Sequence, residues 1–289
     1  MKKYILISLA VLITCTVAIA HTAVSEDNPN ATSASSPQVY TFEANGVTID
    51  MVRVEGGTFT MGATAEQGDD VYADEMPAHE VTLSSYCIGK TEVTQALWQA
   101  VMGVNPSGFK GANLPVEQVS WNDCQVFIAK LNALTGKAFR LPTEAEWEFA
   151  ARGGNFSRGY KYSGSNTLSH VAWYADNSAD KTHPVATKAP NELGIYDMSG
   201  NVYEWCIDWY GDYSSSVQCN PTGPDSGSDR VHRGGSWFSL PRNCCVSFRF
   251  SNTPSDGSDC IGLRLAFEVC RVFPMEQEAV FLCFLGWGI

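Results

Sequence analysis

Cysteine is the residue of this chain with the widest chemical repertoire, and the 289 residues contain ten of them. Cys15 lies in the apolar N-terminal stretch. Without Cys15 nine cysteines remain. Because nine is an odd number, at least one of them is unpaired or pairs with another chain. An oxidising compartment would allow disulfides, whereas buried free thiols are the alternative. The chain has no Cys-x-x-Cys and no two histidines at helical spacing, so the pattern does not match a zinc site.

Two of the cysteines, Cys244 and Cys245, are adjacent. Neighbouring side chains in an extended segment point to opposite faces, so these two thiols are not expected to hold one metal ion together. Other catalytic arrangements are missing as well. The sequence has no His-Glu-x-x-His motif, and the segment GGSWF at residues 234–238 lacks the last glycine of a nucleophile elbow.

The elements that would position these residues are clearest in the first half of the chain. Capping residues, apolar stripes and terminal glycines predict three helices. Their N-caps and stop residues are, in order, Thr91 and Gly103, Ser120 and Gly136, and Thr143 and Arg152–Gly154. Alternating apolar residues predict strands from Val47 to Val54, from Thr58 to Gly62, around Val81 and Leu83, and from Ile261 to Phe267. Most of the sequence between residues 154 and 260 predicts loops.

The composition narrows the class of protein. The hydrophobic fraction is 44% and the charged fraction 17%, which excludes a disordered chain. The formal net charge is −12 and no basic stripe is present, so nucleic acid is not expected as a partner. Frequent Gly, Pro and aromatic residues argue against a helical bundle and favour a loop-rich fold.

The first twenty residues have the features of a signal peptide. Two lysines precede an apolar run that ends in the small-x-small site Ala18–Ala20. We therefore expect an exported protein that is periplasmic, on the cell surface or extracellular. An uncleaved anchor is less favoured because Ser/Asn/Pro/Thr-rich sequence follows the apolar run at once. A lipoprotein attached through Cys15 is less favoured because the apolar run continues past that residue. Residues 21–45 are expected to form a polar linker.

Eight short motifs follow one another along the chain: GGTFTMG at 56–62, EMPAHEVTL at 75–83, KTEVTQALW at 90–98, PVEQVSW at 115–121, RLPTEAEWEFAARGG at 140–154, PNELGIYDMSGNVYEWCIDWY at 190–210, RVHRGGSW at 230–237 and IGLRLA at 261–266. In this order they resemble the formylglycine-generating enzyme family, also called the sulfatase-modifying factor domain. The resemblance covers residues 46–268 and implies an α+β domain with the C-type-lectin-like fold and little regular secondary structure. Residues 269–289 then form an apolar C-terminal tail. Its last part, 279–289, would dock on the domain or on a partner, because an exposed apolar run would aggregate.

The resemblance also identifies where copper would bind. True members oxidise a cysteine of a client sulfatase to formylglycine with O2 and copper(I), which two thiolates hold because Cu(I) is soft. Their positions, two and seven residues after Trp237, are Ser239 and Cys244 here. Ser236 also matches a serine of the active-site motif, and its alternative role is in a turn. A serine hydroxyl is a poor ligand for Cu(I). We therefore expect no copper, and a buried or disulfide-bonded thiol at Cys244.

A calcium site is a second implication of the resemblance. The motif DMSGNVYEW matches a calcium loop of the family. The ligands would be the side chains of Asp197 and Glu204 and the carbonyls of Gly200 and Val202. Calcium binds six to eight oxygens and accepts carboxylates and carbonyls together. The alternative is a solvated acidic turn. We expect structural calcium here.

The segment from Phe238 to Cys260 surrounds the substrate groove in the family. It combines bulky apolar residues with small polar ones, as antibody paratopes do. It also resembles the rewritten segment of variable proteins of diversity-generating retroelements, in which Asn-type codons never become Lys, Glu, Gln, Met or Trp. The segment contains none of these five. The predicted ligand-binding residues are Phe238, Ser239, Leu240, Phe248, Phe250, Ser251, Asn252, Ser258, Asp259 and Cys260. An ordinary loop with core aromatics is the alternative.

Together these features predict an exported, non-catalytic protein that binds a protein or glycan ligand through residues 238–260. The alternative is a sulfatase-maturing oxidase or a degenerate relative of one, which would need a second thiol near Cys244. A structural subunit that assembles through the tail is a third hypothesis.

Overall fold

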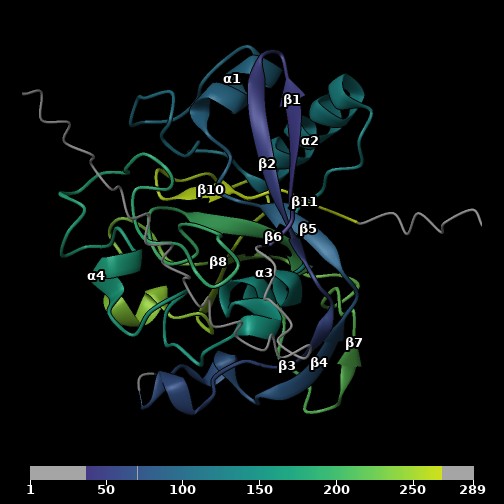
Figure 1. The fold of residues 1–289 in the computed structure, drawn as a ribbon, viewed down its shortest axis with the longest axis vertical. Coiled ribbons are helices and arrows are strands. Elements are labelled where there is room, and N and C mark those ends of the chain that lie inside the picture. Colours follow the sequence, from purple (N-terminus) through teal and green to yellow (C-terminus); the bar gives the residue numbers. More distant parts are fainter. Residues whose placement is uncertain (1–36, 70, 269–289) are drawn as a thin grey trace, which may run out of the picture. The chain divides into compact units, whose positions relative to one another are not determined.

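The computed structural model describes residues 37–69 and 71–268, which contain three small sheets (Figure 1). The first sheet is antiparallel and has the strand order β1-β2-β5-β11. The second has the order β10-β6-β8-β9, with β10 parallel to β6, and the third has the order β3-β4-β7. The strands are β1 (Val39–Ala44), β2 (Val47–Val54), β3 (Gly57–Met61), β4 (His79–Leu83), β5 (Tyr86–Gly89), β6 (Tyr203–Trp209), β7 (Gln218–Cys219), β8 (Arg230–Arg233), β9 (Arg249–Asn252), β10 (Ile261–Leu263) and β11 (Ala266–Glu268).

Helices contribute little of the chain. The α-helices are α1 (Gln95–Met102), α2 (Trp121–Thr135), α3 (Glu144–Ala151) and α4 (Leu168–Val171), and single 3₁₀ turns occupy Ala65–Gln67, Ala73–Glu75, Gly154–Phe156 and Pro241–Cys244. Between α4 and β6 the backbone is loop throughout. The expected α+β class, with short elements and long ordered loops, is confirmed.

Two of the three predicted helix starts are confirmed and one is shifted. Ser120 and Thr143 each accept a hydrogen bond from the third helical N–H, and each forms a capping box with the acidic residue at that position. Thr94, and not Thr91, caps α1, because its side chain accepts a hydrogen bond from the Leu97 N–H. Val93 is held in extended pairing with backbone on both sides, so the helix cannot begin before it. Tertiary pairing here overrides the local capping signal.

The polar linker expected over residues 21–45 does not extend over Val39–Ala44, because these residues form β1 and pair with β2 along their whole length. The aromatic side chains of β1 explain why these residues form a strand. Tyr40 and Phe42 pack on the core, and the Phe42 ring contacts the Phe139 ring edge-on at a centroid distance of 5.5 Å. The predicted signal peptide (1–20) and the tail segment 279–289 lie outside the described residues.

The strand predicted from Ile261 to Phe267 is divided into β10 and β11. Arg264 stands at the break, is fully buried, and forms an ion pair with Glu204. The two halves belong to different sheets, so this arginine lies where the chain passes from one sheet to the other.

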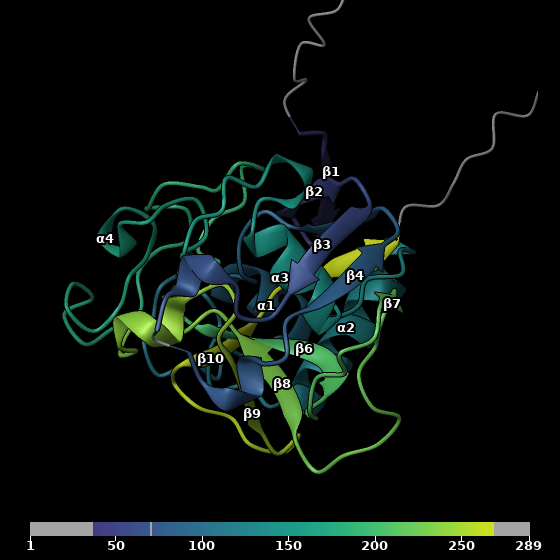
Figure 2. The ribbon, with the colours of Figure 1, turned by 90° about the horizontal axis from the view of Figure 1, so that it is seen from below.

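Helix α3 lies among the sheets, in contact with β3, β6 and β8 (Figures 1 and 2). All eight of its residues are buried, including Trp147 and three glutamates. A helix enclosed in this way needs buried cationic partners for its carboxylates. None of the described helices is both long and apolar enough to cross a membrane.

Candidate functional site

Ser239, the position of the first copper ligand in the family, is enclosed in a cluster of hydroxyl groups. Its Oγ accepts a hydrogen bond from the Ser236 N–H at 2.9 Å and lies 3.1 Å from the Ser236 Oγ. It also donates to the hydroxyl oxygen of Tyr203 at 3.1 Å. Only 5% of Ser239 is exposed, and Ser236 is fully buried. These serines connect a turn to β6 and present no soft ligand to a metal.

Cys244, the position of the second ligand, is fully buried against Gly235. Burial raises the pKa of Cys244 above its usual value, which makes it a poor nucleophile. The neighbouring Cys245 is also buried, and its Sγ lies 3.9 Å from the Pro241 carbonyl oxygen. No disulfide joins two cysteines of the described ranges. Within the same ranges, no three or more His, Cys, Asp or Glu side chains are grouped to hold a metal.

The predicted calcium loop is buried and densely hydrogen-bonded. Asp197 Oδ2 accepts a hydrogen bond from the Ala186 N–H at 2.7 Å, and burial raises the pKa of Asp197 to about 6. Glu204 Oε1 accepts one bond from Arg264 at 2.6 Å. Glu204 Oε2 accepts two, from Arg264 at 2.8 Å and from the Trp147 indole at 2.6 Å.

A third buried carboxylate, Glu92, belongs to this cluster and was missed from the sequence. Its Oε2 lies 3.4 Å from Asn201 Nδ2, and its Oε1 has no hydrogen-bond partner. Burial, followed by the charges of Asp197 and Glu204, raises the pKa of Glu92 well above its usual value. Arg264 forms an ion pair with Glu204, and the charges of Glu92 and Asp197 also act on its guanidinium.

Calcium stays a prediction for this loop. Each carboxylate oxygen has two acceptor positions, so Asp197 and Glu204 retain unused ones after the hydrogen bonds above. With the carbonyls of Gly200 and Val202 they would supply the mixed oxygens that calcium prefers. The unpartnered Glu92 Oε1 is a further buried oxygen that the described residues leave without a hydrogen bond.

The ten residues predicted to contact a ligand fall into three classes of exposure. The exposed ones are Phe238 (53%), Leu240 (56%), Phe250 (53%) and Asp259. The partly buried ones are Ser251, Asn252 and Ser258. The buried ones are Ser239, Phe248 and Cys260, each less than 8% exposed. The prediction is corrected for these last three, because core packing closes them off from any surface ligand.

The exposed rings rest on other aromatic side chains. Phe238 packs on Trp237 at a centroid distance of 5.2 Å, and Trp237 packs edge-on against Phe109 at 5.5 Å. Phe250 stacks on the buried Phe248 at 6.3 Å. Phe109 was missed from the sequence, because it lies more than a hundred residues before the segment that it supports.

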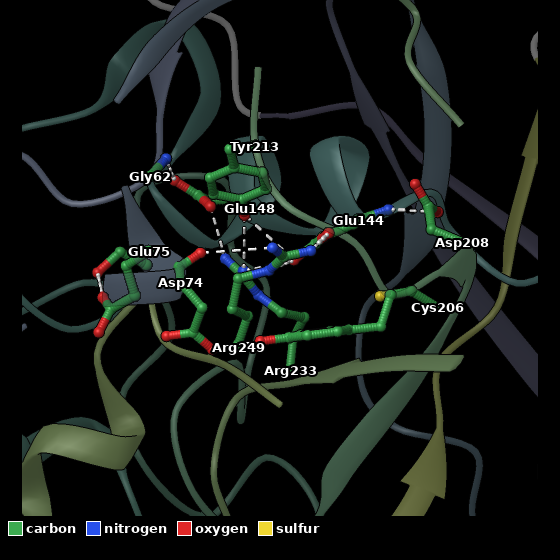
Figure 3. A network of polar contacts seen from close by, with 12 residues as sticks. Gly62, Asp74, Glu75, Glu144, Glu148, Cys206, Asp208, Tyr213, Arg233 and Arg249 are labelled. Atoms are coloured by element: carbon green, nitrogen blue, oxygen red, sulfur yellow. Dashed lines mark hydrogen bonds and ion pairs between the residues drawn. The ribbon is translucent and has the colours of Figure 1, made fainter. Parts of the chain in front are cut away.

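A buried charge network holds β8, which precedes the segment 238–260, and β9, which lies within it (Figure 3). Arg249 of β9 donates from Nε and Nη2 to the two Glu144 oxygens at 2.8 and 2.7 Å. Arg233 of β8 bridges Glu144 at 2.9 Å and Glu148 at 2.6 Å, and also donates to the Val246 carbonyl at 2.7 Å. Burial alone would raise the pKa of Glu144, but the two arginines hold it below its usual value. Bidentate pairs of this kind fix backbone position as well as charge.

The chain matches one protein family over residues 37–269, the sulfatase-modifying factor enzyme 1-like domain. It therefore belongs to that family. The formylglycine-generating enzyme of Streptomyces coelicolor is 31% identical to it over an alignment of 314 positions, gaps included, which covers 84% of this chain and 96% of that protein.

Other relatives are not named as oxidases. The solved structure of Treponema denticola variable protein 1 is 36% identical, with a TM-score of 0.73, and the match covers 81% of this chain and all of that one. Chaperone protein LppX of Paenibacillus barcinonensis is 36% identical over 252 residues, 70% of this chain and 83% of that protein. The predicted C-type-lectin-like fold of the formylglycine-generating-enzyme type is thereby confirmed.

Proposed function

We propose that this protein is an exported, non-catalytic ligand-binding protein whose binding face is the exposed part of residues 238–260. The ligand is a protein or a glycan. The fold supplies a rigid support, and the face supplies large apolar side chains among small polar ones.

The observation that carries this proposal concerns Ser239 and Cys244, the two positions at which the family binds copper. The Ser239 hydroxyl already forms hydrogen bonds with Ser236 and Tyr203, and the Cys244 side chain is fully buried. Copper chemistry of the family needs two accessible soft ligands at these positions. On the same segment Phe238 and Leu240 point to solvent.

The support beneath the face favours recognition over catalysis. Binding residues are commonly carried on loops that a rigid scaffold positions. Arg249 and Arg233 provide that rigidity through buried ion pairs. Rigid aromatic anchors lose little entropy on binding, and adjacent Ser and Asn side chains adapt their hydrogen bonds to the ligand.

Two relatives support the same conclusion. One is named a variable protein, which agrees with the absence of Lys, Glu, Gln, Met and Trp from residues 238–260. Another is named a chaperone protein, a role that requires binding to other proteins. We further propose that the segment is diversified, and that calcium bound at Asp197 and Glu204 is structural.

Two assays test the proposal. The first incubates the protein with copper, O2 and a Cys-x-Pro-x-Arg peptide, and we expect no formylglycine. The second screens protein and glycan arrays with the protein and with the variant Phe238→Ser/Leu240→Ser/Phe250→Ser. Its matched control is Val126→Ser/Leu134→Ser, which removes equally exposed apolar groups from α2. We expect the first variant to lose binding at least tenfold and the control to retain it. Peptide turnover, or binding that both variants retain, would overturn the proposal.

A further inference from the structure

Arg230, the first residue of β8, stacks on two tryptophan rings. Its Cζ atom lies 3.4 Å from the centroid of the Trp209 ring and 4.0 Å from that of the Trp121 ring. All three side chains are partly exposed. The Nη1 atom donates a hydrogen bond to the Ile207 carbonyl oxygen. Two stacking contacts and one hydrogen bond therefore fix the plane of this guanidinium.

The other edge of the Arg230 guanidinium, formed by Nε and Nη2, has no acceptor among the described residues. Nε is buried without a hydrogen-bond partner. Neighbouring Asp229 forms no ion pair with Arg230, and its Oδ2 accepts from the Ser228 hydroxyl at 2.9 Å. The charge of Asp208 acts on Arg230, but Asp208 precedes Trp209 in β6 and so faces the other side of the sheet. A buried donor without an acceptor is costly unless another molecule supplies one.

Two other arginines of this protein show what the same edge binds. Arg249 donates from Nε and Nη2 to the two oxygens of Glu144. Arg264 donates from the same two atoms to the two oxygens of Glu204. The parallel N–H groups of this edge match the spacing of the oxygens of a carboxylate. In Arg230 the same edge is partnered by no described carboxylate, so it fits one from another molecule.

Arg230 lies on the same side of its sheet as part of the proposed binding face. The strands β6, β8 and β9 lie side by side (Figure 2). Trp209 pairs with Arg230, and Arg230 pairs with Asn252, so the three side chains form one row across the strands. Asn252 comes two residues after the exposed Phe250, and both therefore point to the same side of β9. The row extends the proposed binding face from Phe250 to Arg230.

The residue types of this row favour a protein as the ligand. Tryptophan and arginine are enriched among the residues that contribute most to binding between proteins. The chain has a formal net charge of −12, so a long acidic segment would be repelled. A single carboxylate beside apolar groups avoids that repulsion and fits both Arg230 and Phe250.

We propose that Arg230 binds the carboxylate of one aspartate or glutamate side chain of a protein ligand through its Nε–Nη2 edge. Trp121 and Trp209 hold the guanidinium in place, so little side-chain entropy is lost when the carboxylate binds. This inference rests on the proposed function, because the same ligand would also cover Phe250.

A random dodecapeptide library selected on the full chain tests the proposal. Each selected peptide is remade with every Asp changed to Asn or every Glu to Gln, one position at a time. We expect one of these changes to weaken binding at least about tenfold, as loss of a charge-assisted hydrogen bond implies. Arg230→Gln should weaken the acidic peptide by a similar factor and should bind the acidic and amide peptides equally. Arg158→Gln, at an exposed arginine, is the matched control and should change binding less than about threefold.

The peptide changes need no altered protein, so they test the proposal even if Arg230→Gln does not fold. The proposal is overturned if no carboxylate of the selected peptides matters, or if folded Arg230→Gln still prefers the acidic peptide. Peptides that lose binding to Phe238→Ser/Leu240→Ser/Phe250→Ser but not to Arg230→Gln overturn this inference and leave the proposed function intact. Peptides that depend on Arg230 alone support the carboxylate site and contradict the proposed face. Selection of no peptide also overturns the inference, whereas glycan binding by the same protein would leave the proposed function standing.

Discussion

Arg249 and Phe250 are consecutive residues of β9, but the Arg249 side chain is buried and the Phe250 side chain is exposed. Arg249 is 2% exposed and joined to Glu144 by two hydrogen bonds, whereas Phe250 is 53% exposed. Alternation along one strand thus puts a buried anchor of the scaffold next to one of the two exposed phenylalanines of the proposed binding face. Stability and recognition can therefore change independently at adjacent positions.

This separation predicts unequal effects of two substitutions. Arg249→Met leaves Glu144 with one cationic partner fewer in a buried site, and should lower the free energy of unfolding by about 3–5 kcal/mol. Phe250→Ser removes a half-exposed ring and should cost less than about 1 kcal/mol. Urea denaturation followed by tryptophan fluorescence measures both. Equal losses would contradict the assignment of Arg249 to the scaffold.

Thiol reactivity should distinguish the cysteines. Cys219 is exposed, whereas Cys244 is fully buried and its pKa is raised. Short treatment with iodoacetamide followed by peptide mapping should modify Cys219 at least about a hundredfold faster than Cys244, because the exposed thiolate is the reactive form. Urea should abolish the difference. Native modification of Cys244 at the rate of Cys219 would reopen the oxidase hypothesis.

His232 should make the protein less stable in acid. It is 1% exposed beneath Phe250, and burial lowers its pKa to about 4 despite a hydrogen bond with Asn252. Because the unfolded chain binds the proton near pH 6.5, stability is lost as the pH falls from about 6.5 to 4, by up to roughly 3 kcal/mol. His232→Phe should remove most of that loss. His170→Gln, at an exposed site, should leave it unchanged. Urea titrations at several pH values provide the comparison.

Calcium should stabilise the fold. Calcium at about a hundredfold excess over its dissociation constant would add roughly 2.7 kcal/mol, and EGTA should lower the melting temperature accordingly. Asp197→Asn should reduce this dependence, whereas Glu80→Gln, on an exposed position of β4, should not. Scanning calorimetry with calcium, magnesium or EGTA measures the effect. Identical melting temperatures in calcium and EGTA would contradict the site.

Local signals were sufficient to predict much of this fold. The boxes at Ser120 and Thr143 depend on residues three apart, so the sequence contains all the information needed to find them. The cap at Thr94 depends on Val93, whose backbone partners Val116 and Leu263 lie elsewhere in the chain. Such pairing cannot be deduced from a local pattern.

The site was predictable to a lesser degree for the same reason. Motif spacing identified Ser239 and Cys244, but their burial depends on how the turn folds against β6. Composition suggested a face over residues 238–260, yet it could not separate the exposed Phe250 from the buried Phe248. Glu92 and Phe109 reach their sites from distant segments that no motif connects to them.

Deep sequencing of this gene across many cells of its source population tests the central claim most directly. If the exposed part of residues 238–260 is a diversified binding face, substitutions will concentrate in the codons of Phe238, Leu240 and Phe250. The codons of Arg233 and Arg249, which anchor the scaffold, will stay constant. Codons 238–260 that vary no more than their flanks would contradict the diversified face and leave a protein with a fixed surface.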